Sequence, residues 1–230
     1  MEAIVLAGGL GTRLREVVSD IPKPMVLVNN QPFLNYILNL LQQHNIRTVI
    51  LATGYLYEKI ERYYGNSYRN MKLVYSIENE PLGTGGGIKL ALEKATTRDV
   101  LILNGDTFFD VNLSQMLARY QQLQPDMIMA LKPMKDIWRY GVVKVKDNRV
   151  VSFEDRKQVP YGYINGGVYI ARNSLFDSYP LPAKFSFEAD FLKKFVMSLN
   201  IAAFISDTFF IDIGIPEDLN KAQIEMKKFK

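Results

Sequence analysis

The sequence predicts an α/β protein of three layers, in which helices cover both faces of a mostly parallel, Rossmann-like mixed sheet. Short apolar runs at 3–7, 48–53 and 100–103 are typical of parallel strands, which are buried on both faces. Apolar residues at helical spacing lie between them, as at 33–44. This alternation of strand and helix predicts right-handed βαβ units around a parallel sheet.

The remaining elements of the first half continue the alternation. Further helices are expected at 58–64, 88–95 and 113–123, and further strands at 72–76 and 127–132. Each expected strand is followed by a polar or glycine-rich stretch. In an open α/β sheet, ligands bind outside the carboxyl ends of the strands, so these stretches are the first places to look for a site.

The pattern changes after about residue 133. Segments 141–146 and 149–154 alternate like two strands and predict a hairpin that turns near Asp147 and Asn148. Later strands are expected at 164–171, 201–205 and 209–213, and later helices at 186–198 and 216–228.

Composition limits the classes of function. The chain has 230 residues, with 28 basic against 24 acidic side chains, a balance that suits an anionic small substrate and shows no dense basic stripe for nucleic acid. It has no cysteine, which excludes disulfides, cysteine zinc sites and a cysteine nucleophile. No apolar run approaches the ~20 residues of a membrane span, and the start does not resemble a signal peptide, so a cytoplasmic protein is expected.

A glycine-rich loop, GGLGTRL at 8–14, follows the first apolar run. Glycines let backbone N–H groups approach a phosphate closely, and Arg13 adds a fork of donors. Lys23 lies between Pro22 and Pro24, which hold the segment extended, and is a second candidate for binding phosphate. Neither the dinucleotide fingerprint nor the Walker A loop is present.

These motifs resemble the signature of the sugar nucleotidyltransferases. LAGGLGTRL at 6–14 and PKPM at 22–25 carry the resemblance, which extends from residue 1 to about 220. It implies transfer of a nucleotide from a nucleoside triphosphate to a sugar 1-phosphate, with release of pyrophosphate. It assigns Leu6, Gly8, Gly9, Gly11, Thr12, Glu80, Gly83 and Gly85 to the nucleotide, and Arg13, Lys23 and Asp106 to catalysis.

A second glycine-rich stretch, EPLGTGGG at 80–87, follows the expected strand at 72–76. Glycines here would let a flat base lie against the backbone, whose groups could read the edge of the base. A helix N-cap at Thr84 is the alternative interpretation. The resemblance implies base recognition, with Glu80 and Gly85 nearest the base, and does not decide which base is bound.

Two carboxylates come directly after expected strands. Asp106 ends NGD at 104–106, and Asp212 lies within FIDIG at 210–214. Mg²⁺ commonly takes one or two carboxylates together with phosphate oxygens and water. An aspartate that only satisfies its own turn is the alternative for Asp106. The resemblance implies that Asp106 and Asp212 hold a catalytic Mg²⁺.

Dispersed polar positions in the second half resemble the family's sugar pocket in order and spacing. Carboxylates and amides suit sugar hydroxyls because they accept or donate pairs of hydrogen bonds. Many relatives have Glu-Lys-Pro where this chain has Glu154 followed by Asp155, so the contact to the sugar phosphate is expected from Arg156, from Lys157 or from elsewhere. The residues that the resemblance assigns to the sugar are Gly105, Gly141, Glu154, Asn165 and Glu188.

Within the family, the chain is most similar to the short, single-domain guanylyltransferases, on MEAIVLAGG at 1–9, VVSDIPKPM at 17–25 and SFE at 186–188. This implies GTP and D-glycero-α-D-manno-heptose 1-phosphate as substrates, and a GDP-heptose for a bacterial surface polysaccharide as product. Mannose 1-phosphate guanylyl transfer and glucose 1-phosphate thymidylyl transfer stay open, because nothing derived from the residues chooses the sugar.

Two other classes of protein are weighed against an enzyme of this family. A metal-dependent glycosyltransferase is disfavoured because Asp106-Thr107-Phe108 is not an Asp-x-Asp motif. A non-catalytic sensor of nucleotide sugars is disfavoured by the complete set of candidate catalytic residues. We expect a single domain over 1–230, with a nucleotide-binding half to about 133 and a sugar-binding half from about 134. Edge strands in the second half could pair subunits, so a homodimer stays open.

Overall fold

The first half of the chain alternates strands and helices, as expected. The computed structural model describes residues 1–9 and 20–229. Helix 113–123 and strand 48–53 have the predicted bounds, and most other elements differ by one or two residues. The elements are β1 Glu2–Leu6, η1 Lys23–Met25, β2 Leu27–Val28, β3 Gln31–Pro32, α1 Phe33–Gln43, β4 Thr48–Thr53, α2 Tyr57–Tyr64, β5 Ser67–Tyr68, β6 Met71–Ile77, α3 Gly83–Leu92, β7 Asp99–Asn104, β8 Thr107–Phe109 and α4 Leu113–Leu123.

The second half is dominated by strands. The predicted hairpin is confirmed, and it turns through two left-handed residues, Asp147 at φ 51° and Asn148 at φ 59°, as a tight hairpin turn requires. The elements are β9 Met127–Ile137, β10 Val142–Lys146, β11 Arg149–Glu154, β12 Val159–Arg172, η2 Phe187–Leu192, α5 Lys193–Phe195, β13 Ile201–Ile205, β14 Phe210–Asp212, α6 Pro216–Glu225 and η3 Met226–Lys228.

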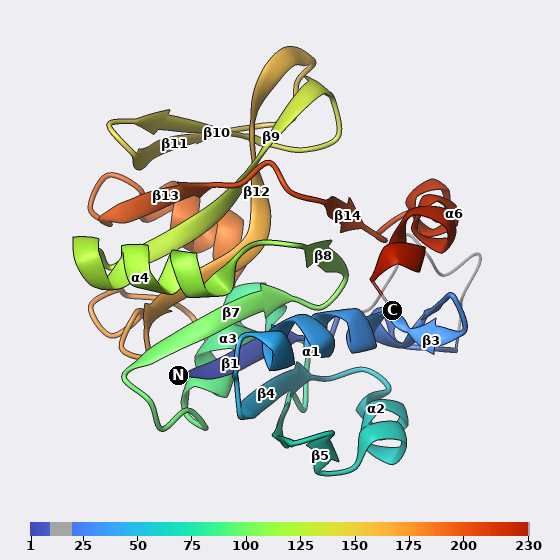
Figure 1. Ribbon diagram of the computed structural model, residues 1–230. Helices are drawn as coiled ribbons and strands as arrows, with labels where there is room; N and C mark the ends of the chain where they lie inside the picture. The colour runs from blue at the N-terminus through green and yellow to red at the C-terminus, as the bar shows by residue number, and fades with distance from the viewer. Residues whose placement is uncertain (10–19, 230) are drawn as a thin grey trace.

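One mixed sheet of ten strands runs through both halves, in the order β10-β11-β13-β9-β12-β7-β1-β4-β6-β5 (Figure 1). The predicted parallel pairing is found among β7, β1, β4 and β6, and again between β9 and β13. Beyond them, β12 runs antiparallel to both β7 and β9, and β10 is antiparallel to β11. Parallel neighbours need a crossover helix, whereas the second half connects several strands through turns, so antiparallel pairing takes over there.

Helices cover both faces of the sheet, and successive residues of the central strand show it. Ala3 and Val5 of β1 pack into a core with α1 and α4, whereas Ile4 between them packs into a second core with α3 and η2. Side chains alternate across a strand, so a fully buried run such as this one needs cover on both sides. Figure 1 shows α1 and α4 in front of the sheet and α3 behind it.

Several predicted elements differ from the structure, among them strands β9 and β12, which extend beyond their predicted bounds to Ile137 and from Val159. Helix α3 begins at Gly83 rather than at residue 88, so the second glycine-rich stretch forms the first turns of the helix. The helix expected at 186–198 is a π-helical turn, η2, followed by the short α5. The strand expected at 209–213 lies outside the large sheet, where β14 pairs with β8.

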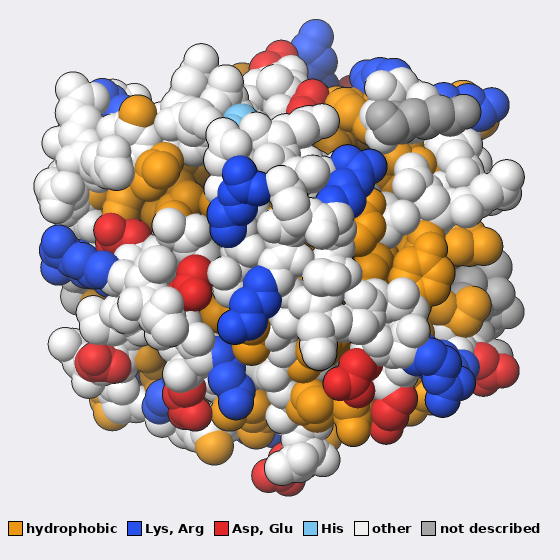
Figure 2. Space-filling view, turned by 60° about the horizontal axis from the view of Figure 1, so that its bottom comes forward, with side chains coloured by type: hydrophobic (Ala, Val, Ile, Leu, Met, Phe, Trp, Pro, Cys, Tyr) orange, Lys and Arg blue, Asp and Glu red, His pale blue; other side chains and the backbone are white. Residues whose placement is uncertain are grey.

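No helix in the described part of the chain is both long and apolar enough to cross a membrane. Figure 2 shows one face of the molecule, on which basic, acidic and hydrophobic side chains are interspersed.

Candidate active site

The loops that follow the central parallel strands meet at one edge of the sheet. The N–H of Gly105, after β7, donates to the carbonyl of Leu6 at the end of β1, at 2.9 Å. A Cβ atom added to Gly8 would lie 2.9 Å from the backbone nitrogen of Gly54, which follows β4. These close approaches leave no room for a side chain at Gly8 or at Gly105. Three predicted residues, Leu6, Gly8 and Gly105, therefore lie together.

Lys23 joins this edge from the short helix η1. Its Nζ lies 3.2 Å from Oδ2 of Asp106, in an ion pair whose two side chains are 18% and 34% exposed. The predicted residues Gly11, Thr12 and Arg13 lie outside the described part of the chain. The structure thus brings together two of the three predicted catalytic side chains.

Asp106 and Asp212 are neighbours because β8 pairs with β14. The pairing sets Asp212 opposite Thr107, and the N–H of Ile213 donates to the carbonyl of Asp106 at 3.0 Å. Burial and the nearby carboxylate of Asp106 raise the pKa of Asp212 to about 6, although the Gly214 N–H, at 2.7 Å from Oδ1, favours the charged form. Two carboxylates that repel each other in this way fit a hard divalent cation.

The two carboxylates, of Asp106 and Asp212, are the number and kind of protein ligands that Mg²⁺ commonly uses. Among the described residues, no group of three or more His, Cys, Asp or Glu side chains could hold a metal. Mg²⁺ commonly binds through one or two carboxylates and takes its remaining ligands from phosphates and water. A site of two aspartates is therefore sufficient when a phosphorylated substrate completes it.

Four of the five residues predicted for the sugar, all except Gly105, line one small cavity of about 50 Å³. Gly141 lies so close to the hairpin that an added Cβ would be 2.9 Å from the carbonyl oxygen of Glu154 and 3.8 Å from Oε1 of Glu188. Aliphatic and aromatic side chains complete the lining of the cavity. Its lining is Tyr140, Gly141, Val143, Phe153, Glu154, Asn165 and Glu188.

Two lysines hold the carboxylate of Glu154 from the hairpin side. Lys157 Nζ lies 2.9 Å from Oε2 and Lys144 Nζ 3.6 Å from the same oxygen. The ammonium group of Lys157, which has the larger effect, and that of Lys144 hold the pKa of the Glu154 carboxyl below its usual range. The neighbouring Asp155 is 93% exposed and pairs with Lys193 at 2.6 Å, so it is directed to α5.

A larger cavity, of about 380 Å³, lies beside Gly8 and includes the predicted Glu80. Its wall also includes Glu78, which the sequence analysis missed. The Glu78 carboxylate is half-buried, and its Oε2 accepts a hydrogen bond from the Leu82 N–H at 3.0 Å. Burial raises the pKa of Glu78. An acidic residue just after a parallel strand is the signal that could have identified it.

The predicted base-binding glycines Gly83 and Gly85 do not line this cavity. Gly83 has φ +74°, and a Cβ on it would lie 2.6 Å from the carbonyl oxygen of Phe185. A Cβ on Gly85 would lie 2.2 Å from the Phe185 ring. The absence of side chains here is used to pack the start of α3 against the segment that contains Phe185.

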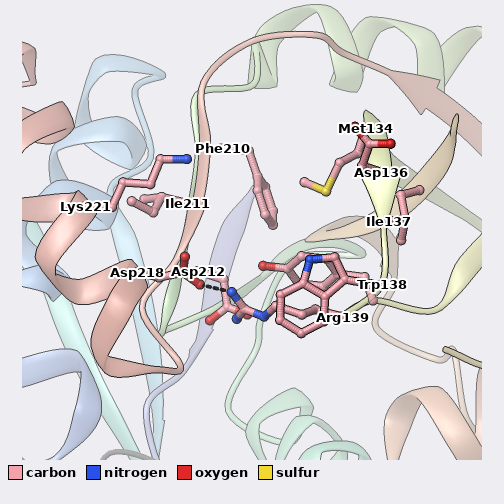
Figure 3. Close-up of a pocket in the computed structure, with 11 residues that line it drawn as sticks. Met134, Asp136, Ile137, Trp138, Arg139, Phe210, Ile211, Asp212, Asp218 and Lys221 are labelled. Atoms are coloured by element: carbon pink, nitrogen blue, oxygen red, sulfur yellow. Dashed lines mark hydrogen bonds and ion pairs between the residues drawn. The ribbon is translucent and has the colours of Figure 1, made fainter. Parts of the chain in front are cut away.

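A third cavity, of about 310 Å³, lies next to Asp212, between the end of β9 and α6. Figure 3 shows the guanidinium of Arg139 pointing toward Asp212 and Asp218, with a dashed line to Asp218 for their ion pair. The sequence analysis did not single out Arg139 or Asp218. They lie 79 positions apart in the chain, and neither belongs to a glycine-rich or proline-rich motif.

The fold and this arrangement define a nucleotidyltransferase, and the chain belongs to the nucleotidyl transferase family, whose model matches residues 2–228. The predicted resemblance is therefore confirmed. The chain is 52% identical over 229 residues to D-glycero-alpha-D-manno-heptose 1-phosphate guanylyltransferase of Aneurinibacillus thermoaerophilus, with 100% of both proteins covered. It is 46% identical over 219 residues to the enzyme of that name from Campylobacter jejuni, covering 95% of this chain and 96% of the relative.

Solved structures agree with this assignment. HddC from Yersinia pseudotuberculosis, crystallised with GMP-PN, has a TM-score of 0.87 and 38% identity, and the match covers 100% of this chain and 99% of that one. A putative glucose-1-phosphate thymidylyltransferase from Bacillus anthracis reaches a TM-score of 0.86 at 18% identity, with 97% and 94% covered, and shows that the fold is shared.

Proposed function

We propose that this protein transfers the guanylyl group of GTP to D-glycero-α-D-manno-heptose 1-phosphate and releases pyrophosphate. The observation that carries the proposal is spatial. Asp106 follows Gly105, whose N–H donates to the Leu6 carbonyl at the end of β1. Asp212 lines a cavity with Arg139, and the residues after Arg139, Tyr140 and Gly141, line the small polar cavity. The choice of substrates is supported by the relative that is 52% identical over its full length.

The reaction needs little acid or base chemistry from the chain. A phosphate oxygen of the sugar 1-phosphate attacks the α-phosphorus of GTP, a new P–O bond forms, and the bond to the β-phosphate oxygen breaks. The attacking oxygen is already an anion, and pyrophosphate leaves as an anion, so catalysis consists of positioning and charge neutralisation.

Specific residues have defined tasks in this scheme. Asp106 and Asp212 would hold Mg²⁺, which supplies positive charge to the phosphates when it is bound. Lys23, now paired with Asp106, is placed to neutralise the triphosphate and the leaving pyrophosphate. Arg13, outside the described residues, is proposed for the same task from the loop after β1.

Carboxylates beside Gly8 support guanine as the base. Glu78 and Glu80 line the larger cavity, next to the phosphate-binding loop. The pairing edge of guanine presents two adjacent donors, its N1–H and its 2-amino group, whereas uracil and thymine present a single N–H there. A carboxylate accepts hydrogen bonds at both oxygens and suits the guanine edge better. Glu78 is the better placed of the two because the Leu82 N–H orients it.

The test is pyrophosphate release with Mg²⁺ across ATP, CTP, GTP and UTP, each paired with manno-heptose 1-phosphate, mannose 1-phosphate and glucose 1-phosphate. We expect turnover with GTP and the heptose at a kcat/KM well above every other pair. Preference for another pair would replace the substrates and keep the class of enzyme. No pyrophosphate with any pair would contradict nucleotidyl transfer, and nucleotide-sugar binding would then distinguish a sensor from a glycosyltransferase.

A further inference from the structure

Arg139 lies at the junction between the metal-binding pair and the sugar cavity. It belongs to the loop that joins β9 to β10. Its side chain lines the same cavity as Asp212, and the next residue, Tyr140, lines both this cavity and the small polar one. A sugar held in the polar cavity, with its phosphate directed to Asp106 and Asp212, would bring that phosphate past the guanidinium.

The guanidinium is held in place from two sides. Its Nη1 pairs with Oδ2 of Asp218 in the first turn of α6, and the two side chains are only 21% and 19% exposed. The ring of Tyr140 lies 5.4 Å from the guanidinium carbon, within the range of a cation–π contact. Among the described residues, Asp218 is the hydrogen-bond acceptor of the Arg139 guanidinium. The other N–H groups of the guanidinium are therefore available to bind an anion.

Two lysines near the sugar cavity are already paired with carboxylates. Lys157 pairs with Glu154 at 2.9 Å, and Lys193 pairs with the exposed Asp155 at 2.6 Å. A phosphate entering between Asp106 and Asp212 needs a compensating charge, and the planar fork of an arginine suits a phosphate in two-point contact.

We propose that Arg139 binds the phosphate of the sugar 1-phosphate, and that Asp218 is the positioning residue that orients it. This inference rests on the proposed function and adds to it the positive charge that meets the acceptor phosphate. Arg139 then serves the acceptor phosphate, and Lys23 serves the triphosphate.

The test compares the KM of each substrate in Arg139→Met, which keeps the aliphatic stem and removes the charge. We expect the KM for the sugar 1-phosphate to rise about 30- to 300-fold, the cost of removing one partner of a partly buried charge pair. The KM for GTP should stay within about threefold. Arg139→Lys should recover about tenfold of the loss, because it restores the charge without the fork. Asp218→Asn should raise the same KM about fivefold.

Lys221→Met is the matched control. Lys221 lines the same cavity but is 58% exposed and pairs with Glu225 at 3.8 Å, so its removal should leave both KM values unchanged. Equal changes of both KM values in Arg139→Met, or a lowered Tm with unchanged KM values, would assign Arg139 a structural role only.

A binding measurement separates this inference from the proposed function. Titration calorimetry would follow mannose 1-phosphate and manno-heptose 1-phosphate into the protein with Mg²⁺ and a non-hydrolysable GTP analogue. If the wild-type protein releases no pyrophosphate yet binds a sugar 1-phosphate, and Arg139→Met abolishes that binding, the proposed function fails and the inference stands. If neither sugar phosphate binds the wild-type protein, both fail. If both bind wild type and variant alike, the inference fails alone.

Discussion

The nucleotide side and the sugar side of the active site are built by different means. On the nucleotide side, glycines and backbone groups at the ends of adjacent parallel strands meet so closely that the Gly105 N–H donates to the Leu6 carbonyl at 2.9 Å. On the sugar side, Glu154, Asn165 and Glu188 come from a hairpin, a long antiparallel strand and a π-helical turn, respectively. A site built from backbone groups requires glycines at neighbouring positions, which form a motif that can be recognised in the sequence. A site built from side chains of distant segments requires only single residues, which form no such motif.

The Asp106–Asp212 pair belongs to both sides, so removing it should have the largest effect. Asp106→Asn should lower kcat by about 1,000-fold, comparable to the loss of one strong electrostatic contact to the transition state. The fold should persist, because Asp106 is 34% exposed and its backbone carbonyl still accepts from the Ile213 N–H. Steady-state pyrophosphate release and a thermal melt would check this. The control is Asp110→Asn, which changes an aspartate directly after β8 whose backbone N–H donates to the Phe209 carbonyl. A variant at position 106 with near-normal kcat would refute the metal assignment.

A variant of the sugar side should separate the two sides. Glu154→Gln keeps the shape but removes the charge that Lys157 and Lys144 neutralise. We expect kcat/KM for the sugar 1-phosphate to fall about 100-fold while the KM for GTP stays unchanged, because the lost hydrogen bonds are to the sugar hydroxyls only. Initial rates with each substrate varied in turn would measure this. A matching rise in the KM for GTP would show that the two sides are coupled.

The packing of glycines on the nucleotide side can be tested through stability. In Gly85→Ala, the new Cβ would meet the ring of Phe185, which is 2% exposed and packed against Phe176 at 5.3 Å, so it cannot move aside easily. The free energy of unfolding should fall by about 1–3 kcal/mol. Gly9→Ala, where no atom of the described residues lies within 4 Å of the new Cβ, should change it by less than about 0.5 kcal/mol. Urea unfolding compares the two, and equal midpoints would contradict the packing argument.

The smallest expected effect concerns the choice of base. Glu78→Gln replaces an acceptor for the two guanine donors by an amide that can accept with only one end. The preference for GTP over UTP should fall about tenfold, measured as the ratio of kcat/KM values with a fixed sugar 1-phosphate. Glu80→Gln, which changes a carboxylate of the same cavity that lacks the Leu82 N–H contact, should change the ratio less. The reverse order would make Glu80 the selective residue.

Contiguous patterns in the sequence by themselves determined most of the first half. The apolar runs of β1, β4 and β7 and the helix at 113–123 could be located because burial on both faces, or on one stripe, leaves a local period. Lys23 and Asp106, which form an ion pair, could be singled out because each lies in a short motif with its own signature. Four of the five positions that the resemblance assigned to the sugar line one cavity, although they are dispersed in the sequence.

Only the tertiary structure decided the rest, because the contacts involved join distant segments. Gly85 is part of a helix rather than of a flexible turn, since the Phe185 ring fills the space where its side chain would be. Strand β14 leaves the large sheet to pair with β8, and this pairing sets Asp212 beside Asp106. Asp218 meets Arg139 across 79 positions, a contact that no local period or composition records. Local propensity determines which elements form, and long-range packing determines which of their side chains share a site.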